Sequence, residues 1–242
     1  INALNKIKHY YSNGDVYKPW RTNICFIADD EDGNLHLDQA EELVLHVDTT
    51  YHEYNIDKIY LDAYQQTTTP SGKRYPEVND RINERVEEGA LIINYTGHGG
   101  ETGWSDEKVL NTTDILLWEN FDHMPLFLTA TCEFSRYDDP WRTAAGELVF
   151  LNPDGGGIAL ITTTRLAFAQ SNFSLNQKFY NHVFEKVNNA HYRLGDIIML
   201  SKIPAIDNNR NIHLLGDPAI TLAYPDHKIE TSSFTNNSQG IY

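Results

Sequence analysis

The sequence predicts an α/β protein in which a mostly parallel, six-stranded sheet is flanked by helices. Two observations lead to this fold class: short apolar runs rich in β-branched and aromatic residues, and the alternation of these runs with helical stretches. The expected strands are Asn23–Ala28, Lys58–Leu61, Ala90–Tyr95, Leu126–Thr131, Gly157–Thr162 and Ala219–Ala223. The expected helices are Leu37–Glu53, Pro76–Glu88, Thr113–Trp118, Thr143–Leu151, Phe173–Val187 and Leu194–Ser201.

Local signals support these elements in chain order. The first helix carries capping-box spacing, with Asp38 three residues before Glu41, and Asn172 stands where it can cap the fifth helix. The segment Thr67–Lys73 contains Pro, Ser and Gly, which predicts an exposed loop. The glycines Gly155–Gly157 precede a strand and lack the Gly-Lys-Ser/Thr ending of a phosphate loop, so we expect a turn there.

Size and composition restrict the classes of protein. With 242 residues, of which 40% are apolar, the chain can bury one substantial core, and we expect one compact domain over residues 1–224. Residues 225–242 are mostly polar, and we interpret them as a linker toward a following domain. No stretch approaches the roughly 20 apolar residues that span a bilayer, so we expect no membrane span. A net charge of −15 without Lys and Arg clusters argues against nucleic acid as a partner.

Two strand ends carry the residues with the clearest chemistry. The strand Ala90–Tyr95 leads into a glycine-rich turn that contains His98, and the strand Leu126–Thr131 leads directly to Cys132. Because ligands bind at the carboxyl ends of parallel strands, we expect the imidazole and the thiol to face one cleft. The other cysteine, Cys25, lies inside an apolar strand and is interpreted as an inert core residue.

A histidine beside a cysteine suits acyl transfer. The thiolate is the nucleophile, and it is scarce near neutral pH unless a base accepts the thiol proton, which His98 could do for Cys132. The tetrahedral intermediate also needs preorganised donors, and we expect the backbone N–H groups of Gly99 and Cys132 to form the oxyanion hole. The alternative interpretation is that His98 is a turn residue and Cys132 only packs.

These motifs resemble those of the gingipain-like cysteine peptidases, peptidase family C25. The resemblance rests on Ile93–Gly99 (Ile-Asn-Tyr-Thr-Gly-His-Gly), on Cys132 and on Leu215–Pro218 (Leu-Gly-Asp-Pro), and it extends from Ile24 to Leu222. It implies a caspase-like three-layer sandwich with residues 1–224 as the catalytic subdomain. Within the family, Thr131–Pro140 and Asn152–Gly157 look most like a branch, the PorU-type sortases of the type IX secretion system.

The resemblance implies an activity and a location. A sortase of this branch removes the C-terminal sorting domain of secreted proteins through a thioester, here on Cys132, and transfers the product to water or to an amine of lipopolysaccharide. The implied partners are secreted proteins with C-terminal sorting domains and other type IX secretion components, at the bacterial outer membrane or cell surface. The alternative within the family is a secreted gingipain-type endopeptidase of general proteolysis.

Further site residues follow from the resemblance and, for Arg165 and Phe168, from their position after a strand. In gingipains an acidic residue after the first strand of this subdomain contacts the catalytic histidine, and Glu31 holds that position, with Asp30 as its substitute. Arg165 and Phe168 follow a strand at the same edge and are candidates for the substrate cleft. Gingipains that cut after Arg or Lys use an acid in the specificity pocket, and Asp38 lies near the matching region.

The thiol chemistry requires no cofactor, and we expect no metal at the catalytic site. The acidic turn Asp29–Asp38 could hold a structural calcium ion, since hard cations prefer carboxylates and gingipains contain calcium sites. It is not an EF-hand, because Leu35 occupies the position that requires glycine. Two rival functions stay open. One is a metal-dependent hydrolase in which His98, Asp106 and the turn Asp29–Asp32 bind a cation and Cys132 only packs, and the other is an inactive peptidase-fold module that binds exported proteins.

Overall fold

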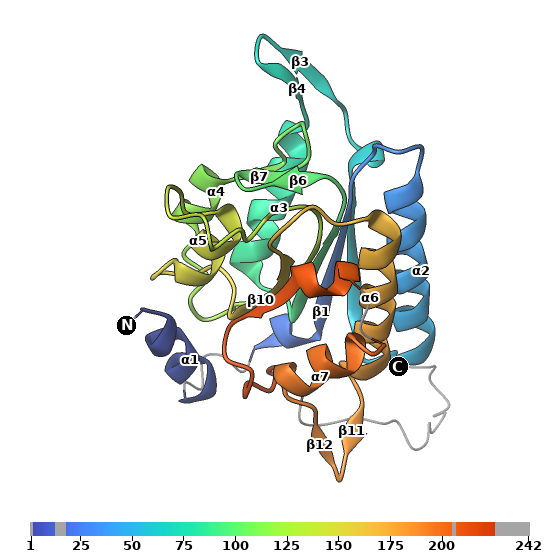
Figure 1. Ribbon diagram of the computed structural model, residues 1–242, viewed down its shortest axis with the longest axis vertical. Helices are drawn as coiled ribbons and strands as arrows, with labels where there is room; N and C mark the ends of the chain where they lie inside the picture. The colour runs from blue at the N-terminus through green and yellow to red at the C-terminus, as the bar shows by residue number, and fades with distance from the viewer. Residues whose placement is uncertain (1, 13–17, 205–206, 226–242) are drawn as a thin grey trace, which may run out of the picture.

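A six-stranded sheet forms the centre of the fold, which confirms the predicted α/β class (Figure 1). In the computed structural model, which describes residues 2–12, 18–204 and 207–225, the strand order is β13-β10-β9-β5-β1-β2. Neighbouring strands are parallel, except that β13 runs antiparallel to β10. The strand bounds are Asn23–Ala28 (β1), Asn55–Tyr60 (β2), Ile92–Thr96 (β5), Leu126–Ala130 (β9), Ala159–Thr163 (β10) and Ile212–Leu215 (β13).

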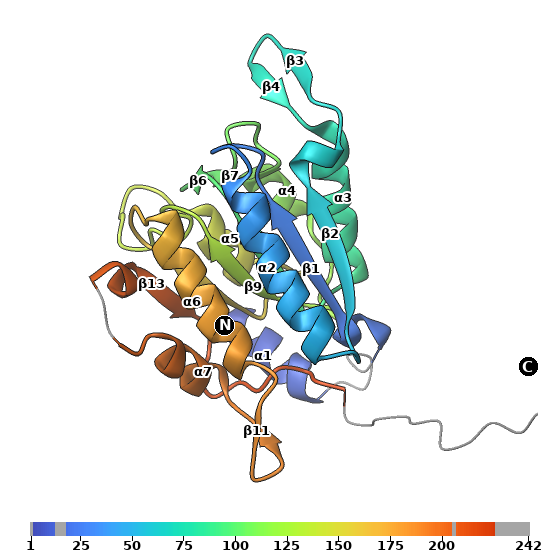
Figure 2. The same cartoon turned by 90° about the vertical axis from the view of Figure 1, so that its right-hand side faces the viewer.

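Helices cover both faces of the sheet and produce three layers. The helices α2 (Leu35–Thr50), α6 (Ala169–His182) and α7 (Leu194–Ser201) share one hydrophobic cluster with one face, and Figure 2 shows α2 and α6 side by side there. The helices α3 (Pro76–Glu88), α4 (Thr112–Leu117) and α5 (Ala145–Leu151) share a second cluster with the other face. Because both faces of the sheet are buried, the sequences of the central strands are continuous apolar runs.

The predicted strand Ala219–Ala223 is wrong, because the sixth strand is Ile212–Leu215. Alternate side chains of the predicted segment, at Ile220 and Leu222, are buried, which produces the period-two pattern of a strand. Its backbone, however, is held outside the sheet, where the Ala223 N–H donates to the Tyr10 hydroxyl.

Several short elements were not predicted. The helix α1 (Asn2–Ser12) precedes the first strand, and the expected loop at Thr67–Lys73 is instead an exposed hairpin of β3 (Thr67–Thr69) and β4 (Gly72–Arg74). A three-stranded sheet of β6 (Gly99–Gly100), β7 (Gly103–Trp104) and β8 (Leu110–Asn111) follows β5 directly. A hairpin of β11 (Lys186–Val187) and β12 (Ala190–His191) projects from the opposite end of the molecule to β3 and β4 (Figure 1).

Two further predictions concern the whole chain. None of the helices in the described residues is long and apolar enough to cross a membrane. The predicted linker 225–242 lies outside the described residues from position 226 onward.

Candidate active site

The loops that carry His98 and Cys132 leave neighbouring strands at the same edge of the sheet. Thr96 of β5 is paired with Ala130 of β9, and each candidate residue follows two positions later. The two loops touch, because a Cβ placed on Gly99 would lie only 2.5 Å from Oγ1 of Thr131. The juxtaposition that the strand order predicts is therefore present, while the catalytic roles of the two residues stay a prediction.

The backbone of the half-buried His98 is held on both sides. Its N–H donates to Oδ2 of Asp29 at 2.8 Å, and its carbonyl accepts hydrogen bonds from the Tyr95 hydroxyl at 2.6 Å and from the Ser105 N–H at 2.9 Å. Trp104, fully buried, stacks on Tyr95 with ring centroids 4.3 Å apart. The backbone of His98 is thus fixed by buried residues, although its loop begins in a glycine-rich turn.

Two carboxylates face Nε2 of the His98 ring. Asp32 is the closer, with Oδ2 at 3.0 Å, and Glu31, the predicted third catalytic residue, has Oε2 at 3.8 Å. Asp32, Gly33 and Asn34 all have positive φ, a conformation that these residue types tolerate, and this turn leads the chain from β1 into α2. A carboxylate at Nε2 holds the proton there and leaves Nδ1 as the basic nitrogen.

A second histidine, His36 of α2, lies beside this pair and was not predicted. Its side chain is 5% exposed, its ring meets that of His98 edge-to-face at 5.2 Å, and its Nε2 is 3.5 Å from Oδ2 of Asp32. Burial lowers the pKa of His36, and the nearby His98 adds to that effect. The one sequence signal for it is its spacing of four residues from Asp32 at a helix start.

Three carboxylates gather behind the His98 loop. Oxygens of Asp29, Asp30 and Glu107 lie within 4.8 Å of one another, and burial raises the pKa of Asp29 to about 6. Oδ1 of Asp30 and Oε2 of Glu107 are buried without a hydrogen-bond partner among the described residues. This all-oxygen set suits a hard cation such as Ca²⁺. Asp29 and Asp30 belong to the predicted acidic turn, whereas Glu107 was not predicted.

The thiol of Cys132 is partly buried at the end of β9. Its Sγ lies 3.5 Å from the carbonyl oxygen of Ala167, in the segment that follows β10. The next residue, Glu133, has a left-handed φ of 48° and donates its N–H to the Arg165 carbonyl, which turns the chain sharply after the cysteine. By contrast, Cys25 is fully buried, and burial raises the pKa of its thiol.

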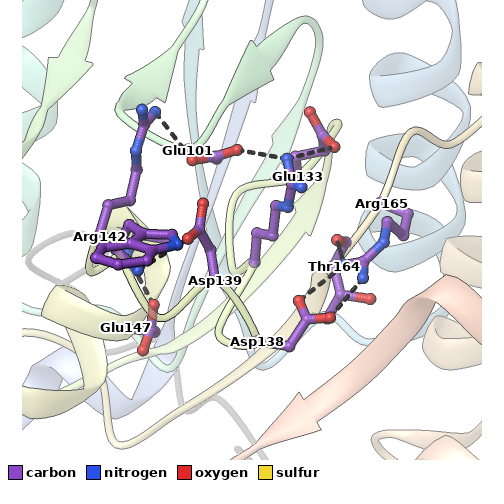
Figure 3. Close-up of polar contacts among 11 residues, drawn as sticks. Glu101, Glu133, Asp138, Asp139, Arg142, Glu147, Thr164 and Arg165 are labelled. Atoms are coloured by element: carbon purple, nitrogen blue, oxygen red, sulfur yellow. Dashed lines mark hydrogen bonds and ion pairs between the residues drawn. The ribbon is translucent and has the colours of Figure 1, made fainter.

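An ion-pair network ties the two loops together (Figure 3). Glu101, directly after β6, has a side chain only 12% exposed and lies 2.9 Å from both Arg136 and Arg142. Arg136 also lies 3.6 Å from Glu133, the neighbour of Cys132. The backbone adds a bond of 2.7 Å from the Ala145 N–H to the Glu101 carbonyl. The segment after the thiol is thereby anchored to the segment after the imidazole.

The predicted substrate-binding residues have different surroundings. The Arg165 guanidinium is paired with Asp138 through both terminal nitrogens, and this hydrogen bonding lowers the pKa of Asp138 to about 2 (Figure 3). Phe168 is 78% exposed and follows Ala167, which contacts the thiol. Asp38 is exposed in the first turn of α2, and within the described residues no hydrogen bond or ion pair connects it to the Cys132 loop.

The model of the family described as peptidase family C25 matches residues 1–223. The chain belongs to this family. Lys-gingipain from Porphyromonas gingivalis is 29% identical over 108 residues, which cover 45% of this chain and 6% of that protein. Gingipain R2 from the same organism is 25% identical over 167 residues, or 66% of this chain and 21% of that protein.

Solved structures are similar in fold. The crystal structure of the Arg-specific cysteine proteinase gingipain R (RgpB) aligns with a TM-score of 0.72 at 18% identity, covering 91% of this chain and 52% of that one. The complex of the Porphyromonas gingivalis RgpB pro- and mature domains aligns with a TM-score of 0.73 at 18% identity, covering 91% and 53%. The C25 chain described here therefore spans about half the length of these structures and less of its curated relatives.

Proposed function

We propose that this chain is the catalytic part of a cysteine endopeptidase in which Cys132 is the nucleophile and His98 the base. The single observation that carries the proposal is the contact between the His98 and Cys132 loops at the carboxyl edge of adjacent strands. The acid at Nε2 of His98 adds support, because it orients the ring and stabilises the imidazolium that forms.

The proposed reaction proceeds in two acyl transfers. Nδ1 of His98 accepts the Sγ proton, and the thiolate of Cys132 attacks the scissile carbonyl carbon. The N–H groups of Gly99 and Cys132 donate to the oxyanion. The C–N bond then breaks, the leaving amine takes the proton from His98, and a thioester remains on Cys132. Water or an amine attacks that thioester and gives its proton to His98. The C–S bond then breaks, and His98 returns the proton to Sγ of Cys132.

For the substrate, we propose the sorting reaction that the sequence resemblance implies: removal of a C-terminal sorting domain at the bacterial outer membrane or cell surface. Two segments carry the resemblance to sortases, and only one of them, Thr131–Pro140, contains the thiol residue Cys132. The other, Asn152–Gly157, is a structural turn, in which Asn152 donates to the carbonyls of Ile115 and Trp118. General gingipain-type proteolysis is the second candidate, and membership of the C25 family supports it equally.

Substitution of the two proposed catalytic residues tests the chemistry. Cys132→Ala and His98→Ala should each abolish peptide hydrolysis while the thermal midpoint stays near that of the native protein, because both side chains sit on loops. Iodoacetamide should label Cys132 before the fully buried Cys25, and Cys25→Ala serves as the control that retains both activity and labelling. Labelling of Cys25 first, or full activity in Cys132→Ala, would disprove the assignment.

A substrate pair separates the sortase from the general peptidase. One protein carries a C-terminal sorting domain, and its partner ends before that domain; unfolded casein serves as a general substrate. A sortase should cleave only the first, at one position, and an added amine should appear on the new C-terminus. Cleavage of casein at many sites with no preference for the sorting domain would favour general proteolysis.

We also propose that any bound calcium is structural, held by Asp29, Asp30 and Glu107. The support is a cluster of two buried carboxylates, Asp29 and Glu107, and the partly buried Asp30. The neighbours Tyr75 and Gln66 are neutral hydrogen-bond donors. Calcium should raise the thermal midpoint of the native protein, and Glu107→Gln should remove that increase. An equal increase in both proteins would exclude this cluster.

A further inference from the structure

Two imidazole rings and one carboxylate lie close together at the proposed active site. One ring nitrogen of His36, one ring nitrogen of His98 and an oxygen of Asp32 all lie within 4.8 Å of one another. Asp32 Oδ2 stands between the two rings, 3.0 Å from His98 and 3.5 Å from His36. The three residues come from only two segments, the β1–α2 connection with the first turn of α2 and the loop after β5.

These separations match the edges of a metal coordination polyhedron. Zinc binds histidine nitrogen and carboxylate oxygen at roughly 2.0–2.2 Å, so two ligand atoms in a tetrahedral site lie about 3.4 Å apart. The observed 3.0 Å and 3.5 Å bracket that separation. A set of two nitrogens and one oxygen suits zinc and similar transition metals, whereas calcium prefers oxygen ligands alone.

The state of His36 independently indicates a missing ligand. Its ring is almost fully buried, yet neither ring nitrogen has a hydrogen-bond partner among the described residues, and Nε2 is 3.5 Å from Asp32. A buried polar group without a partner destabilises a protein by about 1–3 kcal/mol. A metal ion shared with Asp32 and His98 would give Nε2 of His36 the partner that it lacks, whereas Nδ1 would stay without one.

We propose that Asp32, His36 and His98 form a zinc-binding site, and that bound zinc inhibits the peptidase. The inhibitory part rests on the proposed role of His98 as the base. When Nε2 of a neutral imidazole binds a metal, the ring proton must reside on Nδ1. Nδ1 then has no lone pair to accept the thiol proton of Cys132. Zinc therefore blocks the first proton transfer without contacting the sulfur.

A binding measurement tests the site without any activity. Zinc chloride is titrated into Cys132→Ala, in which the thiol cannot bind the metal, and into Cys132→Ala/His36→Gln. The first should bind one zinc ion, and the second should bind it at least about 10-fold more weakly, since even groups behind a ligand contribute 10–100-fold to metal affinity. Equal affinities would overturn the site. If His36→Gln does not fold, Asp32→Asn, whose side chain is 52% exposed, replaces it.

An inhibition measurement then tests the regulatory step. Each variant with an intact Cys132 is compared with its own rate in the absence of metal. Zinc should inhibit the native protein reversibly, a chelator should restore the rate, and His36→Gln should need at least about 10-fold more zinc for half inhibition. Calcium should not inhibit. Equal zinc sensitivity in both proteins would assign inhibition to the thiol and overturn the proposal.

The two measurements separate failure of this inference from failure of the proposed function. Zinc binding that depends on His36 in a protein without peptidase activity would retain the site and reject the peptidase. Activity that survives Cys132→Ala and is lost with a chelator would reject inhibition and favour the metal-dependent hydrolase. Peptidase activity without zinc binding would reject this inference alone.

Discussion

Oδ2 of Asp32 lies 3.0 Å from Nε2 of His98, closer than the 3.8 Å of Glu31. The closer carboxylate should contribute more to orienting the ring, so Asp32→Asn should lower kcat/KM about 10-fold, the effect of about 1.4 kcal/mol. This magnitude allows for the exposure of both groups, which weakens their attraction. Glu31→Gln should change kcat/KM by less than about 3-fold. Steady-state kinetics on a peptide substrate measures both values. A lower kcat/KM in Glu31→Gln than in Asp32→Asn would assign the orienting role to Glu31.

Gly99 lies where the two loops meet, and its neighbour Gly100 provides a matched control. A Cβ on Gly99 would lie 2.5 Å from Thr131 Oγ1, whereas a Cβ on Gly100 would have nothing within 4 Å. Gly99→Ala should therefore push the loops apart, lower the free energy of unfolding by about 1–3 kcal/mol and reduce kcat/KM. Gly100→Ala should change stability by less than about 0.5 kcal/mol. Denaturant unfolding of both variants checks this, and equal losses would contradict it.

The strands that are buried along their length are the ones whose bounds the sequence predicts most closely. β5 and β9 are buried throughout, and their apolar runs are visible in the sequence. The antiparallel edge strand β13 is only partly buried and lacks such a run, while Ile220 and Leu222 alternate with more exposed residues outside the sheet. Local pattern alone cannot separate pairing in a sheet from packing beside one.

The candidate site likewise contains residues that the sequence predicts and residues that it does not. The positions of His98 and Cys132 follow from one rule about strand ends, which requires only the order of the elements. His36 and Glu107 reach the site through the fold: His36 by its helical position four residues after Asp32, and Glu107 through the β6–β7–β8 sheet. The spacing of Asp32 and His36 does not reveal that His36 is buried beside His98, and the contact of Glu107 with Asp29 and Asp30 joins segments that are distant in the sequence.

The burial of Asp29 predicts a stability that falls as pH rises. Its carboxyl has a pKa of about 6 in the folded protein, against 3.8 as the ordinary value, so between these values the folded chain retains a proton that the unfolded chain loses. Stability is therefore lost as pH rises through this window. Relative to Asp29→Asn, the native protein should lose roughly 2 kcal/mol between pH 4 and pH 8.

Denaturant unfolding of both proteins at the two pH values, with a chelator present to remove cations from the carboxylate cluster, measures this difference. Asp38→Asn, at an exposed position, is the control and should follow the native protein. A constant difference between Asp29→Asn and the native protein would show that Asp29 keeps its ordinary pKa in the folded state.

Glu101 should determine how firmly the thiol loop is held. Its nearly buried carboxylate pairs with Arg136 and Arg142, so Glu101→Gln leaves both guanidinium groups without that charge. We expect a loss of about 2 kcal/mol, lower kcat/KM and faster trypsin cleavage after Arg136 or Arg142. The exposed pair of Arg193 and Asp196 offers the control, since Asp196→Asn should have almost no effect. Unchanged trypsin cleavage in Glu101→Gln would contradict the anchoring role.

Lys6 should give the opposite pH dependence to Asp29. Its ammonium is fully buried and donates to the Val149 and Phe150 carbonyls at the end of α5, and burial lowers its pKa from 10.5 to about 7. Between these values the unfolded chain binds a proton that the folded chain does not, so stability rises with pH. Relative to Lys6→Met, the native protein should gain roughly 2 kcal/mol between pH 7 and pH 9. Exposed Lys8→Met is the control, and a gain of the same size there would show that the effect does not come from burial at Lys6.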